Sequence, residues 1–111
     1  MDRVRSYHAH IYFDAATRDD AREICREAGE NFPVQIGRFH EQPVGPHPMA
    51  SCQIAFGQAV FAEIVPWLAL NRRNLIVFLH PETGDELSDH TSHAIWMGQM
   101  IDLDLSVFKQ D

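Results

Sequence analysis

A proline-braced loop constrains this chain of 111 residues more than any other stretch of its sequence. The loop lies within residues 39–53, and its centre reads Gly45-Pro46-His47-Pro48. Each proline fixes its own φ and lacks a backbone N–H, and the residue before a proline is pushed out of the helical region. Helix is therefore excluded through the loop, and His47 is presented on a stiffened segment. The other histidines occupy positions 8, 10, 40, 80, 90 and 93.

The composition narrows the class of protein and of partner. The chain is 45% hydrophobic and 23% charged, which is typical of a globular protein, and we expect one domain over residues 1–111. The formal net charge of −7 argues against nucleic acid or an anionic membrane as a partner, so a small molecule is expected. No apolar run resembles a signal peptide or a membrane span, which makes the cytoplasm the default location.

The two cysteines are isolated in the sequence. Cys25 and Cys52 lack the Cys-x-x-Cys spacing and fall in apolar periodic segments. Thiols in such positions behave as small hydrophobic groups. We expect two reduced core cysteines in preference to a disulfide, and neither is a candidate nucleophile.

Hydrophobic periodicity predicts alternating strands and helices. Strands are expected at residues 7–13, 34–39, 49–56 and 75–79. A further half-exposed strand is expected at 101–107, where apolar residues alternate with Asp102, Asp104 and Ser106. The polar segment 82–93 is expected to be a loop with at most one helical turn.

Two helices are expected between these strands. The first begins at Thr17, which forms a capping-box-like pair with Asp20, and stops at Gly29. The second covers residues 58–71, and Pro66 must either kink it or delay its start. The order predicts an α+β fold, a ferredoxin-like βαββαβ antiparallel sheet with two helices on one face and an appended C-terminal strand.

This topology predicts that histidines meet. We expect the first and third strands to be central and mutually parallel, which would place the starts of these strands and the ends of the second and fourth at one end of the sheet. The histidines expected at this end are His8, His10, His40, His47 and His80. His90 follows the fourth strand and could fold over the same place.

The histidine pattern points to a metal or catalytic site. His8 and His10 lie two residues apart, so both imidazoles project from one face of a strand, which Tyr12 and Gln53 also share. A single histidine is more often structural, and His40 and His93 are interpreted in that way. Imidazole suits zinc, copper, nickel and iron, and a carboxylate beside two histidines is typical of non-haem Fe(II) sites. The sequence does not choose among the loop carboxylates Glu41, Glu82, Asp85, Glu86 and Asp89.

Several motifs between Tyr7 and Phe108 together resemble one known family. They are Tyr7-His8-Ala9-His10-Ile11-Tyr12-Phe13, Pro43-Val44-Gly45-Pro46-His47-Pro48, Pro66-Trp67-Leu68 with Asn71, His80-Pro81 with Thr83-Gly84, and Asp89-His90 followed by Ala94, Trp96 and Gly98. In these segments the chain resembles the DOPA 4,5-dioxygenase family of small bacterial and fungal proteins. The resemblance implies a ferredoxin-like, dimeric enzyme that opens a catechol ring beside its hydroxyls with Fe(II) and O₂.

The leading hypothesis is therefore an extradiol-type dioxygenase acting on DOPA or a related catechol. The residues that match the family are His8, His10, His47, His80 and His90. We expect His10, His47 and His80 to bind the metal, and His8 or His90 to act as acid or base. Zinc or nickel could replace iron in purified protein.

Further residues are candidates for substrate binding. Tyr12, Gln53 and Trp96 could contact the catechol ring. A substrate carboxylate could be held by Arg38, Arg72 or Arg73. Two rival functions stay open, a dimeric module that binds a metal or a small aromatic compound without turnover and a cofactor-free monooxygenase. The size, the exposed sheet face and the expected strand at 101–107 predict a homodimer.

Overall fold

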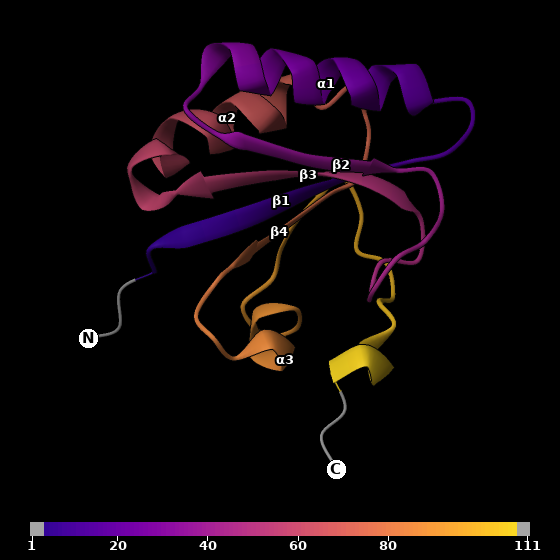
Figure 1. The fold of residues 1–111 in the computed structure, drawn as a ribbon, viewed down its shortest axis with the longest axis vertical. Coiled ribbons are helices and arrows are strands. Elements are labelled where there is room, and N and C mark those ends of the chain that lie inside the picture. Colours follow the sequence, from indigo (N-terminus) through magenta and orange to yellow (C-terminus); the bar gives the residue numbers. More distant parts are fainter. Residues whose placement is uncertain (1–3, 109–111) are drawn as a thin grey trace.

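A five-stranded antiparallel sheet is the frame of the computed structural model, which describes residues 4–108. The strands lie in the order β2-β3-β1-β4-β5. Their bounds are β1 Ser6–Phe13, β2 Gln35–His40, β3 Ala50–Gly57, β4 Val77–Pro81 and β5 Ile95–Met97. The predicted α+β, ferredoxin-like class is confirmed, with two long helices on one face of the sheet and loops with the short helices α3 (Glu86–Asp89) and η2 (Leu105–Phe108) on the other (Figure 1).

The helices α1 (Arg18–Asn31) and α2 (Phe61–Asn71) cover the same face of the sheet (Figure 1). The sequence had predicted that the first helix stops at Gly29, but α1 continues to Asn31. Gly29 lets the helix approach β2, because a Cβ at this position would lie 3.2 Å from Cγ1 of Ile36. Before α2, residues Gln58–Val60 form the short 3-10 helix η1, and Pro66 lies inside α2.

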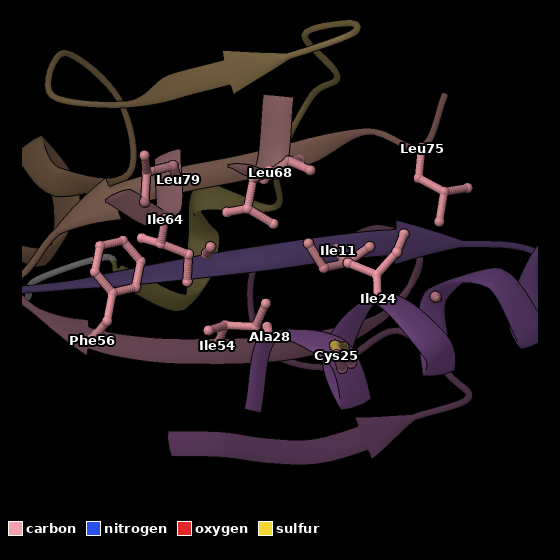
Figure 2. Close-up of a cluster of buried hydrophobic side chains, with 14 of the residues drawn as sticks. Ile11, Ile24, Cys25, Ala28, Ile54, Phe56, Ile64, Leu68, Leu75 and Leu79 are labelled. Carbon is pink, nitrogen blue, oxygen red and sulfur yellow. A yellow bond between two sulfur atoms is a disulfide. The ribbon is translucent and has the colours of Figure 1, made fainter. Parts of the chain in front are cut away.

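The core fills the space between the helices and the sheet (Figure 2). Along β1 the side chains of Ala9, Ile11 and Phe13 face the helices and are buried, as the alternation predicts. From α2, Ile64 and Leu68 meet them and are fully buried. Each large apolar side chain buried in this way stabilises the fold by about 1.5–3 kcal/mol.

Cys25 of α1 and Cys52 of β3 form a disulfide across this core, with their Cα atoms 7.1 Å apart. The prediction of reduced thiols was wrong. Both side chains face the interior from the opposing surfaces of helix and sheet, where both residues are buried. Residues separated by 27 positions in the sequence give no local sign of this proximity.

The predicted strand at residues 101–107 is absent. Residues 101–104 have no regular structure, and Leu105–Phe108 forms the short 3-10 helix η2. The carboxylate of Asp104 accepts hydrogen bonds from the backbone N–H and hydroxyl of Ser106, a local pairing that favours a turn over a strand. The appended strand is instead β5, which pairs antiparallel with β4.

The direction of the central strands also differs from the prediction. β1 runs antiparallel to both β3 and β4, so its start lies beside their ends. His8 and His80 are direct neighbours in this register, whereas His40 and His47 approach from the opposite end of the sheet. The crossover through α1 makes β2 parallel to β1, and β3 lies between them and runs antiparallel to both. The prediction of parallel first and third strands did not take this crossover into account. None of the helices within residues 4–108 combines the length and apolar character needed to span a bilayer.

Candidate metal centre

The sheet face opposite the helices carries the histidines. On β1, residues His8, His10 and Tyr12 alternate with the core residues and therefore point to this face. On β4, Phe78 and His80 lie beside them in register. His10 and His80 retain only 4% and 2% of their accessible surface, so this face is a buried layer of aromatic rings.

Three imidazoles form a group that could hold a metal ion. His8, His10 and His80 each offer a ring nitrogen, and these nitrogens all lie within 4.8 Å of one another. The Nε2 atoms of His10 and His80 are 3.2 Å apart. Two nitrogens bound to one ion at about 2.1 Å lie about 3.0–3.4 Å apart for angles of about 90–109°. The residues present therefore fit a divalent metal.

Glu82 lies at the outer edge of two of these rings. Its Oε1 lies 3.0 Å from Nδ1 of His8 and 3.5 Å from Nδ1 of His80. Nδ1 of His80 also lies 2.9 Å from the carbonyl oxygen of Pro81. An acceptor at Nδ1 holds a ring with its Nε2 free for a metal, which is the usual support for histidine ligands.

Three of the five carboxylates suggested by the sequence have partners away from the clustered histidines, namely Glu41, Asp85 and Asp89. Glu41 pairs with Arg18, and Asp85 accepts a hydrogen bond from Ser88 at the start of α3 (Glu86–Asp89). Asp89 accepts bonds from the backbone and side chain of Thr83. Glu82 is the carboxylate of this group that touches the clustered histidines.

His47 reaches the cluster because the proline loop folds back over the sheet. Its ring centroid lies 4.1 Å from that of His10, and its Nδ1 is 2.7 Å from the hydroxyl of Tyr12. Gly45 allows the bend with a φ of 54°, a value that glycine adopts readily. The sequence correctly predicted that His8, His10, His47 and His80 meet, although its argument from strand ends was wrong.

The buried histidines favour the neutral form that metal binding requires. Burial, followed by repulsion from His90 and His40, lowers the pKa of His47 to about 4. Burial likewise lowers the pKa of His80 to about 4, although the bond to the Pro81 carbonyl opposes it. The pKa of His10 is held well below its usual value by burial first and then by neighbouring histidines.

The other sequence candidates surround this group. The ring of His90 lies 4.1 Å from that of His80. Trp96 stacks on Phe78 at 4.6 Å and lies 6.3 Å from Tyr12, so it closes one side of the layer. Burial raises the pKa of Tyr12. Sequence reasoning missed Phe78, which lies in an apolar run that the pattern assigned entirely to the core.

A pocket of about 310 Å³ opens beside His10 and His47. Its lining combines residues of β1, β2, β3 and the proline loop, namely His10, Gly37, Arg38, His40, Val44, Gly45, Pro46, His47, Ser51 and Gln53. This volume lies at the lower end of the range for small-molecule sites. Larger hollows of about 390, 920 and 970 Å³ lie elsewhere, and their linings contain none of His8, His10, His47, His80 and His90.

His40 and His93 differ in their relation to the site. His40 lines the pocket, although the sequence had suggested a structural role. His93 lies outside the cluster, with its Nδ1 2.9 Å from Asp89. The signal that would have found His40 is its position at the end of the strand that leads into the proline loop.

Comparisons with known proteins find similar sequences over nearly the whole chain. The model of the Dopa 4,5-dioxygenase family matches residues 7–107. The chain is 33% identical to a DOPA 4,5-dioxygenase of Amanita muscaria and 38% identical to an uncharacterised 21.2 kDa protein of Botryotinia fuckeliana. These matches cover 93% and 95% of this chain but only 49% and 64% of the relatives.

A solved structure is closer in length. The crystal structure of a candidate dioxygenase from Nostoc punctiforme superimposes with a TM-score of 0.93 at 44% identity. The match covers 95% of this chain and 91% of that protein. The similarity therefore extends over nearly the whole fold.

Proposed function

Because the chain belongs to the Dopa 4,5-dioxygenase family, we propose that it opens the ring of a catechol, such as DOPA or a related dihydroxyphenyl compound, using Fe(II) and O₂. The observation that carries this proposal is the group of three imidazoles within 4.8 Å of one another at His8, His10 and His80. Three histidine ligands would leave coordination positions for a substrate and O₂, the feature that non-haem iron sites of this class share.

In this proposal His8, His10 and His80 hold the metal, and His47 faces the substrate. The roles of His8 and His47 are thus exchanged relative to the assignment made from sequence. The support is geometric, because His8 belongs to the group of ring nitrogens within 4.8 Å of one another, whereas His47 is not part of that group and has its Nδ1 bonded to the Tyr12 hydroxyl. Zinc or nickel would fit the same nitrogen donors.

When bound, Fe(II) supplies a Lewis acid and a template on which a catechol and O₂ meet. The chain itself supplies proton acceptors beside this position. Neutral His47, at Nε2, can accept a proton from a catechol hydroxyl while its Nδ1 stays bonded to Tyr12. His90 lies beside His80 and is the second candidate for a proton carrier.

The ring of the substrate requires a flat apolar surface and exclusion of water. Trp96 and Tyr12 belong to the aromatic layer beside the histidines, with their ring centroids 6.3 Å apart, and are the candidates for such a surface. Gln53 lines the pocket beside His10 and can hydrogen-bond a polar group of the ligand. In this proposal these residues position a small aromatic compound and take no covalent part in the reaction.

The test of the function is oxygen consumption by protein that is purified anaerobically and loaded with Fe(II). We expect O₂ uptake with at least one of a panel of catechols and a ring-opened product, identified by mass spectrometry. The variant His80→Ala should lose metal and activity, while the control His93→Ala should keep both because His93 lies outside the cluster. Metal binding without O₂ uptake would favour the binding-module alternative, and activity that survives exhaustive chelation would favour the cofactor-free alternative.

A further inference from the structure

A β-bulge interrupts the edge strand β2 beside the pocket. Ile36 pairs with Ile54 and Phe39 pairs with Cys52, so three steps along β2 match only two along β3. One extra residue is therefore inserted in β2, between these two pairs. A bulge of this kind re-aims a side chain relative to the regular alternation.

The bulge moves Arg38 to the histidine face of the sheet. The side chain of Ile36 lies beside Gly29 of α1, and the ring of Phe39 stacks on the core residue Phe13. Both side chains therefore point to the face of the sheet that the helices cover. Strict alternation from Ile36 would turn Arg38 toward the helices. Arg38 instead lines the pocket together with His10 and His47.

Gly37 keeps the space beside Arg38 open. A Cβ at this position would lie 3.3 Å from Cβ of Gln53 and 3.7 Å from its Nε2. Any side chain at position 37 would therefore crowd Gln53 at the pocket wall. The bulge therefore places Gly37, which leaves space, next to Arg38, which brings a positive charge to the pocket.

The charge around the pocket favours an anionic group. None of the residues that line it is acidic, although the whole chain carries a net charge of −7. No carboxylate of residues 4–108 lies within ion-pair distance of Arg38. The other two arginines suggested by the sequence are engaged, because Arg72 donates to the Leu75 carbonyl and Arg73 pairs with the acidic residues Asp20, Glu23 and Glu27.

We propose that Arg38 determines specificity by binding a carboxylate on the side chain of the catechol. This inference rests on the proposed function and adds the substrate class to it. The pocket shares His10 with the metal group and extends to Arg38. A ring bound at the histidines would therefore direct its acidic substituent to the guanidinium, which forms charge-assisted bonds with carboxylates.

The test compares an acidic and a neutral catechol on matched variants. Binding of 3,4-dihydroxyphenylacetate and 4-methylcatechol is measured by calorimetry on metal-free protein, and KM is measured on Fe(II)-loaded protein. Arg38→Gln should weaken binding of the acid about tenfold, the effect of losing one charged hydrogen bond, and leave the neutral compound within about twofold. Arg38→Lys should restore part of the loss.

Arg22→Gln is the control, because it removes the same charge from the helix side, where the Arg22 guanidinium lies 4.3 Å from the centre of the Phe39 ring. It should change neither affinity. Equal effects of Arg38→Gln on both catechols, or no preference of the native protein for the acid, would overturn the inference. Arg38-dependent binding of the acid without O₂ uptake would reject only the proposed reaction, and uptake that does not depend on Arg38 would reject only the inference.

Discussion

Lowering the pH from 7 to 5 should destabilise the metal-free protein through its buried histidines. The pKa values of His47 and His80 are about 4 in the folded state, whereas an exposed histidine titrates near pH 6.5. Between these values the unfolded chain binds more protons than the folded chain. The free energy of unfolding therefore decreases as the pH falls through this window.

The size of the effect follows from the two pKa values. At pH 5 an unfolded histidine gains about 2 kcal/mol from protonation, and a folded one with a pKa near 4 gains almost nothing. Partial solvent screening reduces this to about 1–2 kcal/mol for each residue, so His47 and His80 together should lower stability by about 2–4 kcal/mol. His10 shifts in the same direction. Such a loss is a large part of the roughly 5–15 kcal/mol typical of a domain.

Urea denaturation at pH 7 and pH 5, in the presence of a chelator, measures this loss. The double variant His47→Gln and His80→Gln should lose less stability on acidification than the native chain. The lowered pKa values of Asp85 and Asp104, caused by hydrogen bonds from serines, affect stability only near and below pH 4 and do not disturb the comparison. A native chain equally stable at both pH values, or an undiminished loss in the double variant, would refute the reasoning.

Three further results are expected. Tyr12→Phe leaves Nδ1 of His47 without its partner, so the free energy of unfolding should fall by about 1–3 kcal/mol and kcat on a catechol should drop, as measured by denaturation and O₂ uptake. Glu82→Gln should weaken metal affinity about 10–100-fold, measured by competition with a chelator, because it removes the negative charge beside Nδ1 of His8 and His80. Light scattering at micromolar concentration should give the mass of a homodimer, and a monomer would contradict that prediction.

The helices and strands that follow from local hydrophobic periodicity were predictable from the sequence. The alternation on β1 correctly separated Ile11 from His10, and the apolar spacing located both long helices. The prediction of a strand at 101–107 was wrong because alternation alone does not reveal the hydrogen bonds that the Asp104 side chain accepts within a turn. The Cys25–Cys52 bond and the antiparallel pairing of the first and third strands depend on tertiary arrangement, which no single segment encodes.

The clustering of the histidines was predictable from the sequence, but the path by which each one reaches the cluster was not. His8, His10 and His80 lie on strands, so a period of two places them on one face. His47 belongs to a loop whose path over the sheet is set by packing, and its contact with Tyr12 is therefore invisible in the sequence. Arg38 depends on the bulge in β2, an insertion that breaks the period on which sequence reasoning relies.

The two faces of β1 suggest how this protein could diversify. Ala9 and Ile11 serve the core, while the intervening His8 and His10 serve the histidine layer. A substitution on the second face acts on the histidine layer and leaves the packing against the helices in place. Laboratory evolution of new ring-cleaving or ligand-binding activities can therefore randomise the histidine layer and the bulge while the helix-facing positions are held constant, with a screen for stability because the histidine layer is itself buried.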